Sequence, residues 1–453
     1  MNIINKIFPN LFTKNNIRTI KSGDNFTTLI FKANSYNGYE REEAVNQLGE
    51  LGNSEAMPIL LLRVNDWVYQ VRNASLKAID KLLVNKNAKT IVQYLPEIYK
   101  LQSYKRENHT QLFTRILSFL LKEENSSYLI KVIDSQNIIL SRISFKICVK
   151  HKLLTIEQCV EKGLSSKDVI VRTYAAKLLS TLKGKYLEDY LVIAIHDKFM
   201  FVRREAFKIY LNKYPERGLF FANKFLFDKS FSIREIAIRY LQKNDVNVET
   251  IFINVLKDKK SSILYLKCAI DELGYLGSTR TISLIKNFMI HSSRSIRKVT
   301  LESLVALQSN NSKEYLLQGM QDESAKVVKR ASRLLIRSND VDIDKIFKIS
   351  KVSKYNHTLS FSLFSIRTIN RWERLLFLLK LFDSTIIKDK AKKNILENEL
   401  RHWNTYYNQT NTQPTQKQIK NIIFEYRKSE DLFEKDIYEI LELTIRTLVK
   451  QQY

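Results

Sequence analysis

The stretch Asp197-Lys-Phe-Met-Phe-Val-Arg-Arg-Glu-Ala-Phe-Lys-Ile-Tyr210 carries a pattern that returns along the middle of the chain. An aliphatic anchor residue is followed by a basic residue, and a small residue stands four positions after the anchor. The clear copies start at Val171-Arg172, Val202-Arg203, Ile233-Arg234 and Ile296-Arg297, with a weaker copy at Val327. An Asp often stands five positions before the anchor, as at Asp197, Asp228, Asp258 and Asp322. The recurrence indicates a chain built from repeated units.

The repeat has a fixed period. The anchors lie 31 residues apart, except for a gap of 63 in which we place a worn copy at Ile263. Asp134 with Ile139 is interpreted as a further degenerate copy. A period in the thirties predicts a stack of helix pairs, because two helices of about twelve residues and two turns fit in it. The anchor, the small residue and the apolar residues that follow share one helical face, which neighbouring repeats bury.

The beginning of the chain carries the same signature. Asp66 stands five positions before Val71-Arg72, after the segment Tyr39-Glu-Arg-Glu-Glu-Ala-Val-Asn-Gln-Leu-Gly-Glu-Leu-Gly52. The Leu-Gly-x-Leu-Gly ending of this segment returns in Glu272-Leu-Gly-Tyr-Leu-Gly277. Residues 39–83 resemble a HEAT repeat, in particular the HEAT-like type named after phycobilisome lyases, and the resemblance covers about residues 38–340.

The resemblance implies an all-α fold, a right-handed α-α superhelix (HEAT-like solenoid) of roughly eight to ten pairs. It also implies structural roles for the recurring Asp and Arg. In HEAT families the Asp lies in the turn before the second helix, where it can cap backbone N–H groups. The Arg can pair with the Asp of a neighbouring repeat. We therefore do not count either residue as functional.

Composition agrees with this fold and suggests the domain organisation. The 453 residues include only 10 Gly and 5 Pro, which favours helices joined by short turns over sandwiches or barrels. We divide the chain into an N-terminal segment (1–37), the repeat array (38–370) and a helical C-terminal capping module (371–453). An atypical terminal unit is expected because the end of an array needs a polar face. The same module is also a possible docking site for a partner.

The charge of the chain points to an acidic partner. Lys and Arg number 74 against 47 Asp and Glu, a net charge of +27. Six positions after the anchors, a column of basic residues recurs that we name the basic ladder: Lys77, Lys177, Lys208, Arg239 and Arg333. The column is interrupted at Phe145, Ala269 and Glu302, and Arg204, Lys298, Lys329, Arg330 and Arg337 could widen it. Second helices line the concave surface of such arrays, so the ladder predicts a basic groove.

Several functions remain open for this groove. The first is a non-enzymatic scaffold or adaptor whose groove binds an acidic protein segment. The second is a nucleic-acid-binding protein held by phosphate contacts. A third interpretation assigns the ladder no ligand: it is solvated surface in a chain rich in Lys, Asn and Ile, as AT-rich coding sequences tend to be.

Catalytic functions are less favoured. The chain contains no phosphate-binding loop and no His followed by Glu, which HEAT-type deoxyhypusine hydroxylases use to bind metal. HEAT-like DNA glycosylases use tryptophans, but Trp67, Trp372 and Trp403 are widely separated in sequence. Bilin lyases share the repeat type, yet no other feature indicates a bilin. We expect no cofactor.

The compartment is expected to be the cytoplasm. The three cysteines, Cys148, Cys159 and Cys268, are scattered, which fits a reducing environment. The first twelve residues lack an uninterrupted signal-peptide core. No apolar run approaches the ~20 residues of a membrane span, so we expect no integral membrane segment.

Overall fold

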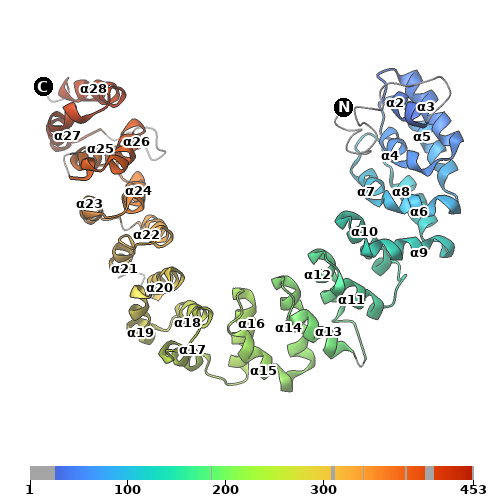
Figure 1. Cartoon of the computed structure of the whole chain (residues 1–453), viewed down its shortest axis with the longest axis horizontal. Helices are drawn as coiled ribbons and strands as arrows, with labels where there is room; N and C mark the ends of the chain where they lie inside the picture. Colours follow the sequence, from blue (N-terminus) through green and yellow to red (C-terminus); the bar gives the residue numbers. More distant parts are fainter. Residues whose placement is uncertain are drawn as a thin grey trace. The chain divides into compact units, whose positions relative to one another are not determined.

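The computed structural model describes residues 26–184, 186–307, 312–339, 341–382, 385–403 and 413–450. Within these ranges the regular structure is helical, without a strand. Internal contacts divide the chain into two units, Met1–Leu219 and Phe220–Tyr453, and the division falls inside α15 (Pro215–Phe225). The predicted all-α, HEAT-like solenoid fold is confirmed, because both units consist of consecutive helices packed as pairs (Figure 1).

The first unit contains five helix pairs and an irregular insertion between the second and third of them. The pairs are α2 (Phe26–Lys32) with α3 (Gly38–Leu51), α4 (Met57–Arg63) with α5 (Tyr69–Leu82), α9 (Glu123–Lys131) with α10 (Ile138–Lys150), α11 (Ile156–Ser165) with α12 (Val169–Leu178), and α13 (Leu187–Ile195) with α14 (Met200–Lys213). The insertion consists of α6 (Ala88–Gln93), α7 (Leu95–Lys100) and α8 (Thr110–Leu120). In this insertion no aliphatic residue is followed directly by Arg.

After the end of α15, the second unit contains α16 (Phe231–Lys243) and then six pairs. These are α17 (Val248–Lys257) with α18 (Ile263–Tyr275), α19 (Ile282–Lys286) with α20 (Arg294–Leu307), α21 (Ser312–Gly319) with α22 (Ala325–Ser338), α23 (Ile343–Val352) with α24 (Asn356–Ser365), α25 (Arg371–Phe382) with α26 (Lys390–Arg401), and α27 (Gln416–Ser429) with α28 (Lys435–Lys450). The second helix of each pair also contacts the next second helix from α18 to α28.

Short 3-10 segments occupy many of the turns. They are η1 (Ser54–Ala56), η2 (Asn85–Asn87), η3 (Leu101–Ser103), η4 (Val132–Asp134), η5 (Thr279–Thr281), η6 (Asn287–Ile290), η8 (Ile366–Thr368), η9 (Thr385–Lys388) and η10 (Glu430–Leu432).

The anchors and the small residues form the contact between neighbouring second helices. Val171, Val202, Ile233, Ile296 and Val327 are all buried, as are Ala175, Ala206, Ala237, Thr300 and Ala331 four positions later. A small residue at this place lets the helices approach closely, and close-packed interiors leave no room for a larger one. The amphipathic stripe predicted from the sequence is therefore confirmed.

The sequence analysis assigned two anchors to the wrong residue. Ile139 is 56% exposed, whereas Leu140 is buried and is followed four positions later by the buried Ser144. Leu140 also lies 31 residues before Val171, so the true period is unbroken there. Ile263 is exposed as well, and the buried stripe of α18 starts at Leu266. Both errors arose because an exposed aliphatic residue at a helix start was mistaken for the anchor.

The Leu-Gly-x-Leu-Gly ending has two separate structural causes. A Cβ added at Gly49 would lie 2.7 Å from the Cβ of Ala78, and one added at Gly274 would lie 2.7 Å from the Cβ of Ser303. The first glycine of each motif therefore permits a close helix contact. The second glycine, Gly52 or Gly277, has φ of 62° or 72° and ends the helix in a conformation that glycine adopts without strain.

The domain borders drawn from the sequence remain a prediction. Residues 1–25 of the proposed N-terminal segment lie outside the described residues. In the proposed C-terminal module, α25 to α28 continue the paired arrangement, and Thr415 caps α27 through a capping box with Gln418. We retain 1–37, 38–370 and 371–453 as the proposed division.

Candidate protein-binding surface

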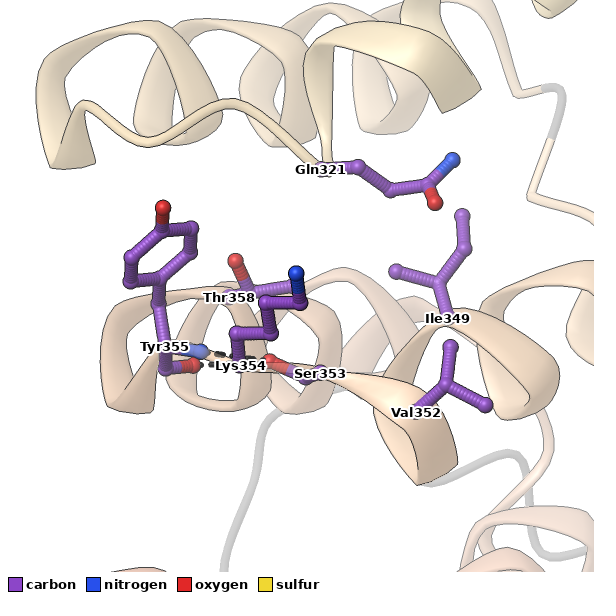
Figure 2. Close-up of a pocket in the computed structure, with 7 residues that line it drawn as sticks. All are labelled: Gln321, Ile349, Val352, Ser353, Lys354, Tyr355 and Thr358. Atoms are coloured by element: carbon purple, nitrogen blue, oxygen red, sulfur yellow. Dashed lines mark hydrogen bonds between the residues drawn. The ribbon is translucent and has the colours of Figure 1, made fainter.

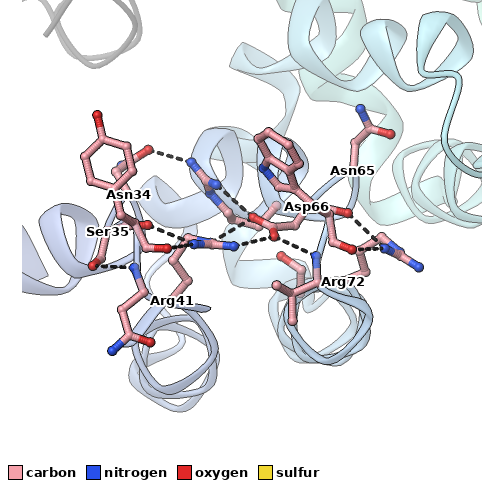
Figure 3. A network of polar contacts seen from close by, with 12 residues as sticks. Asn34, Ser35, Arg41, Asn65, Asp66 and Arg72 are labelled. Carbon is pink, nitrogen blue, oxygen red and sulfur yellow. Dashed lines mark hydrogen bonds and ion pairs between the residues drawn. The ribbon is translucent and has the colours of Figure 1, made fainter. Parts of the chain in front are cut away.

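The recurring Asp and Arg side chains form a buried network at the turn before α5. Asp66 accepts hydrogen bonds from Arg41 Nη2 at 2.7 Å and from Arg63 Nη1 at 2.8 Å (Figure 3). It also accepts the backbone N–H of Val68 at 3.0 Å. Burial favours the protonated acid, but the hydrogen bonds from Arg41, Val68 and Arg63 outweigh it and lower the pKa of Asp66 to about 2.

The same connection recurs between repeats within each unit. Arg172 Nε donates to Asp197 at 2.7 Å and Arg297 Nε donates to Asp322 at 2.7 Å, while Arg142 pairs with Asp168. Six arginines also donate through Nη1 to the two carbonyl oxygens six and five residues earlier, at 2.8 to 3.5 Å: Arg41, Arg72, Arg172, Arg203, Arg234 and Arg297. Each guanidinium thus holds the turn before its own helix. These residues support the fold, as the sequence predicted.

Two details of that prediction are corrected. Asp66, Asp197, Asp228 and Asp322 do not cap the helix, because each accepts the N–H of the N-cap residue itself, two positions further on. They close an Asx-type turn before the helix begins. Arg234 is the second departure, since it pairs with Asp271 and the buried Glu272. Burial raises the pKa of Glu272, against the attraction of Arg234.

The five residues of the basic ladder are all exposed and all lie on second helices. Lys77 lies on α5, Lys177 on α12, Lys208 on α14, Arg239 on α16 and Arg333 on α22. Two of them contact acids on their own helix: Lys208 lies 3.8 Å from Glu205, and Arg239 lies 2.6 Å from Glu235. Each residue has the exposed position that the repeat pattern predicts.

In the second unit the ladder positions between Arg239 and Arg333 do not extend a basic column. Counted from Leu266, where the buried stripe of α18 starts, the ladder position holds the buried Glu272 and not Ala269. Glu302 accepts ion pairs from Lys298 at 3.5 Å and Arg330 at 2.5 Å. In the first unit, Lys77 is separated from Lys177 by the irregular α6–α8 insertion. The five residues are exposed on second helices, and their place in one binding groove stays a prediction.

The corrected register of α10 adds a residue that the sequence analysis missed. Six positions after Leu140 stands Lys146, not Phe145, and Lys146 is exposed whereas Phe145 is buried. Because α10 contacts α12 and α12 contacts α14, Lys146, Lys177 and Lys208 occupy equivalent places on three consecutive second helices. Counting back one period of 31 residues from Val171 would have identified Lys146.

Aromatic and aliphatic side chains lie among these lysines. Residues one before, three after and six after the anchor share one side of a helix. Among the residues at these places are the exposed Ile139, Ile170, Phe201 and Tyr174. On α14 the place three after the anchor holds Glu205, which lies 3.2 Å from Arg204 and 3.8 Å from Lys208. The ammonium groups of Lys146 and Lys177 lie 5.1 and 6.0 Å from the ring centre of Tyr174. The guanidinium of Arg204 lies 4.7 Å from the ring centre of Phe201.

We call this patch the α10–α14 surface, and it is both cationic and apolar. It comprises Ile139, Lys146, Ile170, Tyr174, Lys177, Phe201, Arg204 and Lys208. The helices α10 and α12 contain no acidic residue, and α14 contains one, Glu205. Such a surface suits a ligand that offers negative charge and apolar groups together.

The three tryptophans divide into one buried pair and one exposed residue. The rings of Trp372 and Trp403 lie 5.7 Å apart but are both buried, whereas Trp67 is exposed in the other unit. In the ranges that the structure describes, no group of three or more His, Cys, Asp or Glu side chains is placed to hold a metal ion. None of the described helices is long and apolar enough to cross a membrane.

Comparisons with known proteins were made at three levels. No protein-family model matches the chain, and no curated protein matches it in sequence. Among solved structures, it is similar to the complex of CpcE and CpcF of phycocyanin lyase from Nostoc sp. PCC7120, with 20% identity and a TM-score of 0.23. That likeness covers 54% of this chain and 94% of the other.

Two crystal structures of importin beta are also similar. Their identities are 12% and 11% and their TM-scores 0.31 and 0.30, and the likeness covers 94% and 93% of this chain and 67% of each of theirs. TM-scores this low transfer no ligand and no residue role to this chain, so its function is argued from its own surface.

Proposed function

We propose that this protein is a non-enzymatic scaffold or adaptor that binds an acidic, partly apolar protein segment on the α10–α14 surface. The observation that carries the proposal is that exposed aromatic rings lie on the same helices as lysines that stand at equivalent positions of consecutive repeats. Lys146, Lys177 and Lys208 supply the cations, Tyr174 contacts the first two, and Phe201 contacts Arg204.

The chemistry of this surface favours a peptide with both acidic and apolar side chains. Aromatic and arginine side chains are the groups that most often dominate protein–protein binding energy. Exposed rings such as Tyr174 lose water-exposed area on binding, while the lysines attract the acids and accelerate association. Neighbouring second helices are separated by about 8–10 Å, so a segment of a few turns reaches all three.

Nucleic acid is the second candidate, favoured by the same rings. Single-stranded nucleic acids bind to basic grooves in which aromatic side chains stack on bases. Tyr174 between two lysines offers this arrangement. Ile139 and Ile170 weigh toward a protein segment, because aliphatic side chains have no π face on which a base can stack.

The test replaces Lys146, Lys177 and Lys208 with Glu and measures binding by fluorescence anisotropy. The probes are a labelled peptide of alternating Glu and Leu or Phe, its Gln-for-Glu counterpart, and a labelled single-stranded oligonucleotide. We expect the variant to lose affinity for the acidic peptide by a factor of about 10 or more, since each exposed charge pair contributes up to about 1 kcal/mol. A matched control carries Lys86→Glu, Lys89→Glu and Lys122→Glu, which make the same charge change away from this surface.

Salt dependence separates the two candidates. Loss of three phosphate contacts should flatten the slope of log K against log salt by about 2 for a single strand. An acidic peptide lacks condensed counterions and should show a shallower, screened dependence. If the triple variant binds every probe as the matched control does, the α10–α14 surface is not a binding site and the proposal is wrong.

We also propose that the protein acts in a reducing compartment such as the cytoplasm. Cys148, Cys159 and Cys268 are all free and buried. Burial raises the pKa of the Cys148 thiol to about 12 and that of Cys268 to about 11, which keeps both unreactive.

A further inference from the structure

A pocket of about 470 Å³ lies in the second unit, between the end of α21 and the turn that joins α23 to α24 (Figure 2). Ile349 and Val352 line one side of it. The other lining residues are polar or bear a polar tip: Gln321, Ser353, Lys354, Tyr355 and Thr358. The pocket is remote in sequence from the α10–α14 surface and is argued independently of it.

The pocket exists because this repeat has lost the Asp–Arg connection. One period after Val327 the anchor place holds Thr358, and five positions before it stands Ser353 where other repeats carry Asp. The Arg of the preceding repeat is replaced by the buried Val328. In the repeat before, Arg297 and Asp322 meet at 2.7 Å. Between the turn before α22 and the turn before α24, neither the guanidinium nor the carboxylate is present.

Two of the polar groups around this space, Thr358 and Lys354, have no partner within the described part of the chain. Thr358 is only 2% exposed, and its hydroxyl has no hydrogen-bond partner among the described residues. Lys354 is exposed and makes no ion pair within the described part of the chain. The ten-residue helix α24 begins here, and its N-cap residue Tyr355 makes no side-chain cap hydrogen bond. The positive end of a helix attracts anions.

The side chains converge on one ligand position. Figure 2 shows Lys354, Tyr355 and Thr358 rising from the α24 turn toward Gln321, with Ile349 and Val352 beside them. Ile349 is largely buried and Val352 is exposed at the mouth. An ammonium, a hydroxyl and a helix N-terminus next to two aliphatic side chains match a carboxylate attached to an apolar group.

We propose that this pocket binds the carboxylate of a small apolar residue, such as the C-terminal leucine of a peptide. The carboxylate accepts hydrogen bonds from Lys354 and Thr358 at the start of α24. It occupies the place of the turn Asp that other repeats carry within the chain. The aliphatic side chain packs against Ile349 and Val352.

The experiment follows the δ1 methyl resonance of Ile349 in the full chain, labelled with carbon-13 at isoleucine methyl groups. The resonance is assigned with Ile349→Leu. The probes are N-acetyl-leucine, its neutral counterpart N-acetyl-leucinamide, and inorganic phosphate. We expect N-acetyl-leucine to shift the resonance saturably with millimolar affinity, as is usual for so small a ligand. The other two probes should leave it in place.

Two variants test the contacts. Lys354→Gln should weaken binding of N-acetyl-leucine about tenfold, the usual effect of losing a hydrogen bond to a charged group. Thr358→Val restores the aliphatic anchor of other repeats and removes a buried unpaired hydroxyl, so it should keep the fold and weaken binding several-fold. Lys351→Gln, on the exposed side of α23 outside the pocket, is the matched control and should change nothing.

The outcomes that overturn the proposal are equally definite. Equal shifts with N-acetyl-leucinamide would show that no carboxylate is recognised, and a saturable shift with phosphate alone would assign the pocket to another anion. Unchanged affinity in Lys354→Gln would also refute it. This exposed substitution does not threaten the fold, so it decides the question even if Thr358→Val proves unstable.

Discussion

Replacing Asp66 with Asn tests whether the buried Asp–Arg network contributes measurable stability. Asn keeps the shape and the acceptor for the Val68 N–H, and it resembles the protonated acid. The pKa of Asp66 falls from 3.8 to about 2 in the folded protein. At 1.36 kcal/mol per unit, this difference corresponds to about 2 kcal/mol of stability at neutral pH. Because the folded pKa is depressed, this contribution is fully present above the unfolded pKa. It is lost as the pH falls from about 4 to about 2.

The assay is hydrogen exchange of the α3 and α5 peptides in the full chain, since repeat arrays need not unfold in one step. Asp66→Asn should lower the opening free energy by about 2 kcal/mol at neutral pH, and its difference from wild type should shrink below about pH 4. Asp258→Asn is the matched control. This exposed turn Asp accepts the N–H of Lys260 but has no Arg partner among the described residues. A difference below about 0.5 kcal/mol, the usual effect of a surface substitution, would refute the reasoning. So would a difference that does not change with pH.

Ala206→Phe should destabilise the contact between neighbouring second helices by roughly 1–3 kcal/mol, because Ala206 is fully buried. Urea unfolding measures this loss, and the control Glu205→Phe on the same helix should lose far less stability. Gly49→Ala should also lower the melting temperature, because the new Cβ would lie 2.7 Å from the Cβ of Ala78. A melting temperature equal to that of wild type would show that α3 and α5 are not so close. Ser353→Asp restores the turn Asp and should accept the Tyr355 N–H that Ser353 now accepts at 3.2 Å. It should abolish the N-acetyl-leucine shift at Ile349 without lowering the melting temperature, and retained binding would contradict the proposed ligand position.

The repeat architecture could be predicted from the sequence because its cause is local and periodic. Every buried anchor needs a small residue one turn later, and this spacing is visible without knowing any contact. The two errors, Ile139 and Ile263, arose where a second aliphatic residue lies beside the true stripe. Hydrophobicity alone does not separate an exposed first-turn residue from a buried one, whereas the period of 31 does in the case of Leu140.

The candidate surfaces were harder to predict for a different reason. The exposure of each ladder residue follows from the pattern of its own helix. Whether the basic column is continuous depends on the residues at the equivalent position of the neighbouring repeats. Glu302 and the buried Glu272 interrupt the column, while Lys146 extends it through a register that the packed Leu140 reveals. The pocket at Thr358 depends on two absent side chains in adjacent turns. A missing Asp and a missing Arg leave no positive signal in a scan for motifs.

The Asp–Arg connection has a consequence for how such a chain changes over evolutionary time. Arg172 reaches the Asp of the following repeat, and Arg297 does the same. Consider a repeat that has the turn Asp before its second helix and an Arg in that helix. Its Arg can pair with the Asp of any following repeat of the same kind. Duplication or deletion of one such unit joins an existing Arg to an equivalent Asp and strands no buried charge. The unit of Arg234 lacks this interchangeability, because its partners Asp271 and Glu272 lie in the helix of one specific neighbour. Array length should therefore vary more readily around Val171 and Ile296 than around Ile233.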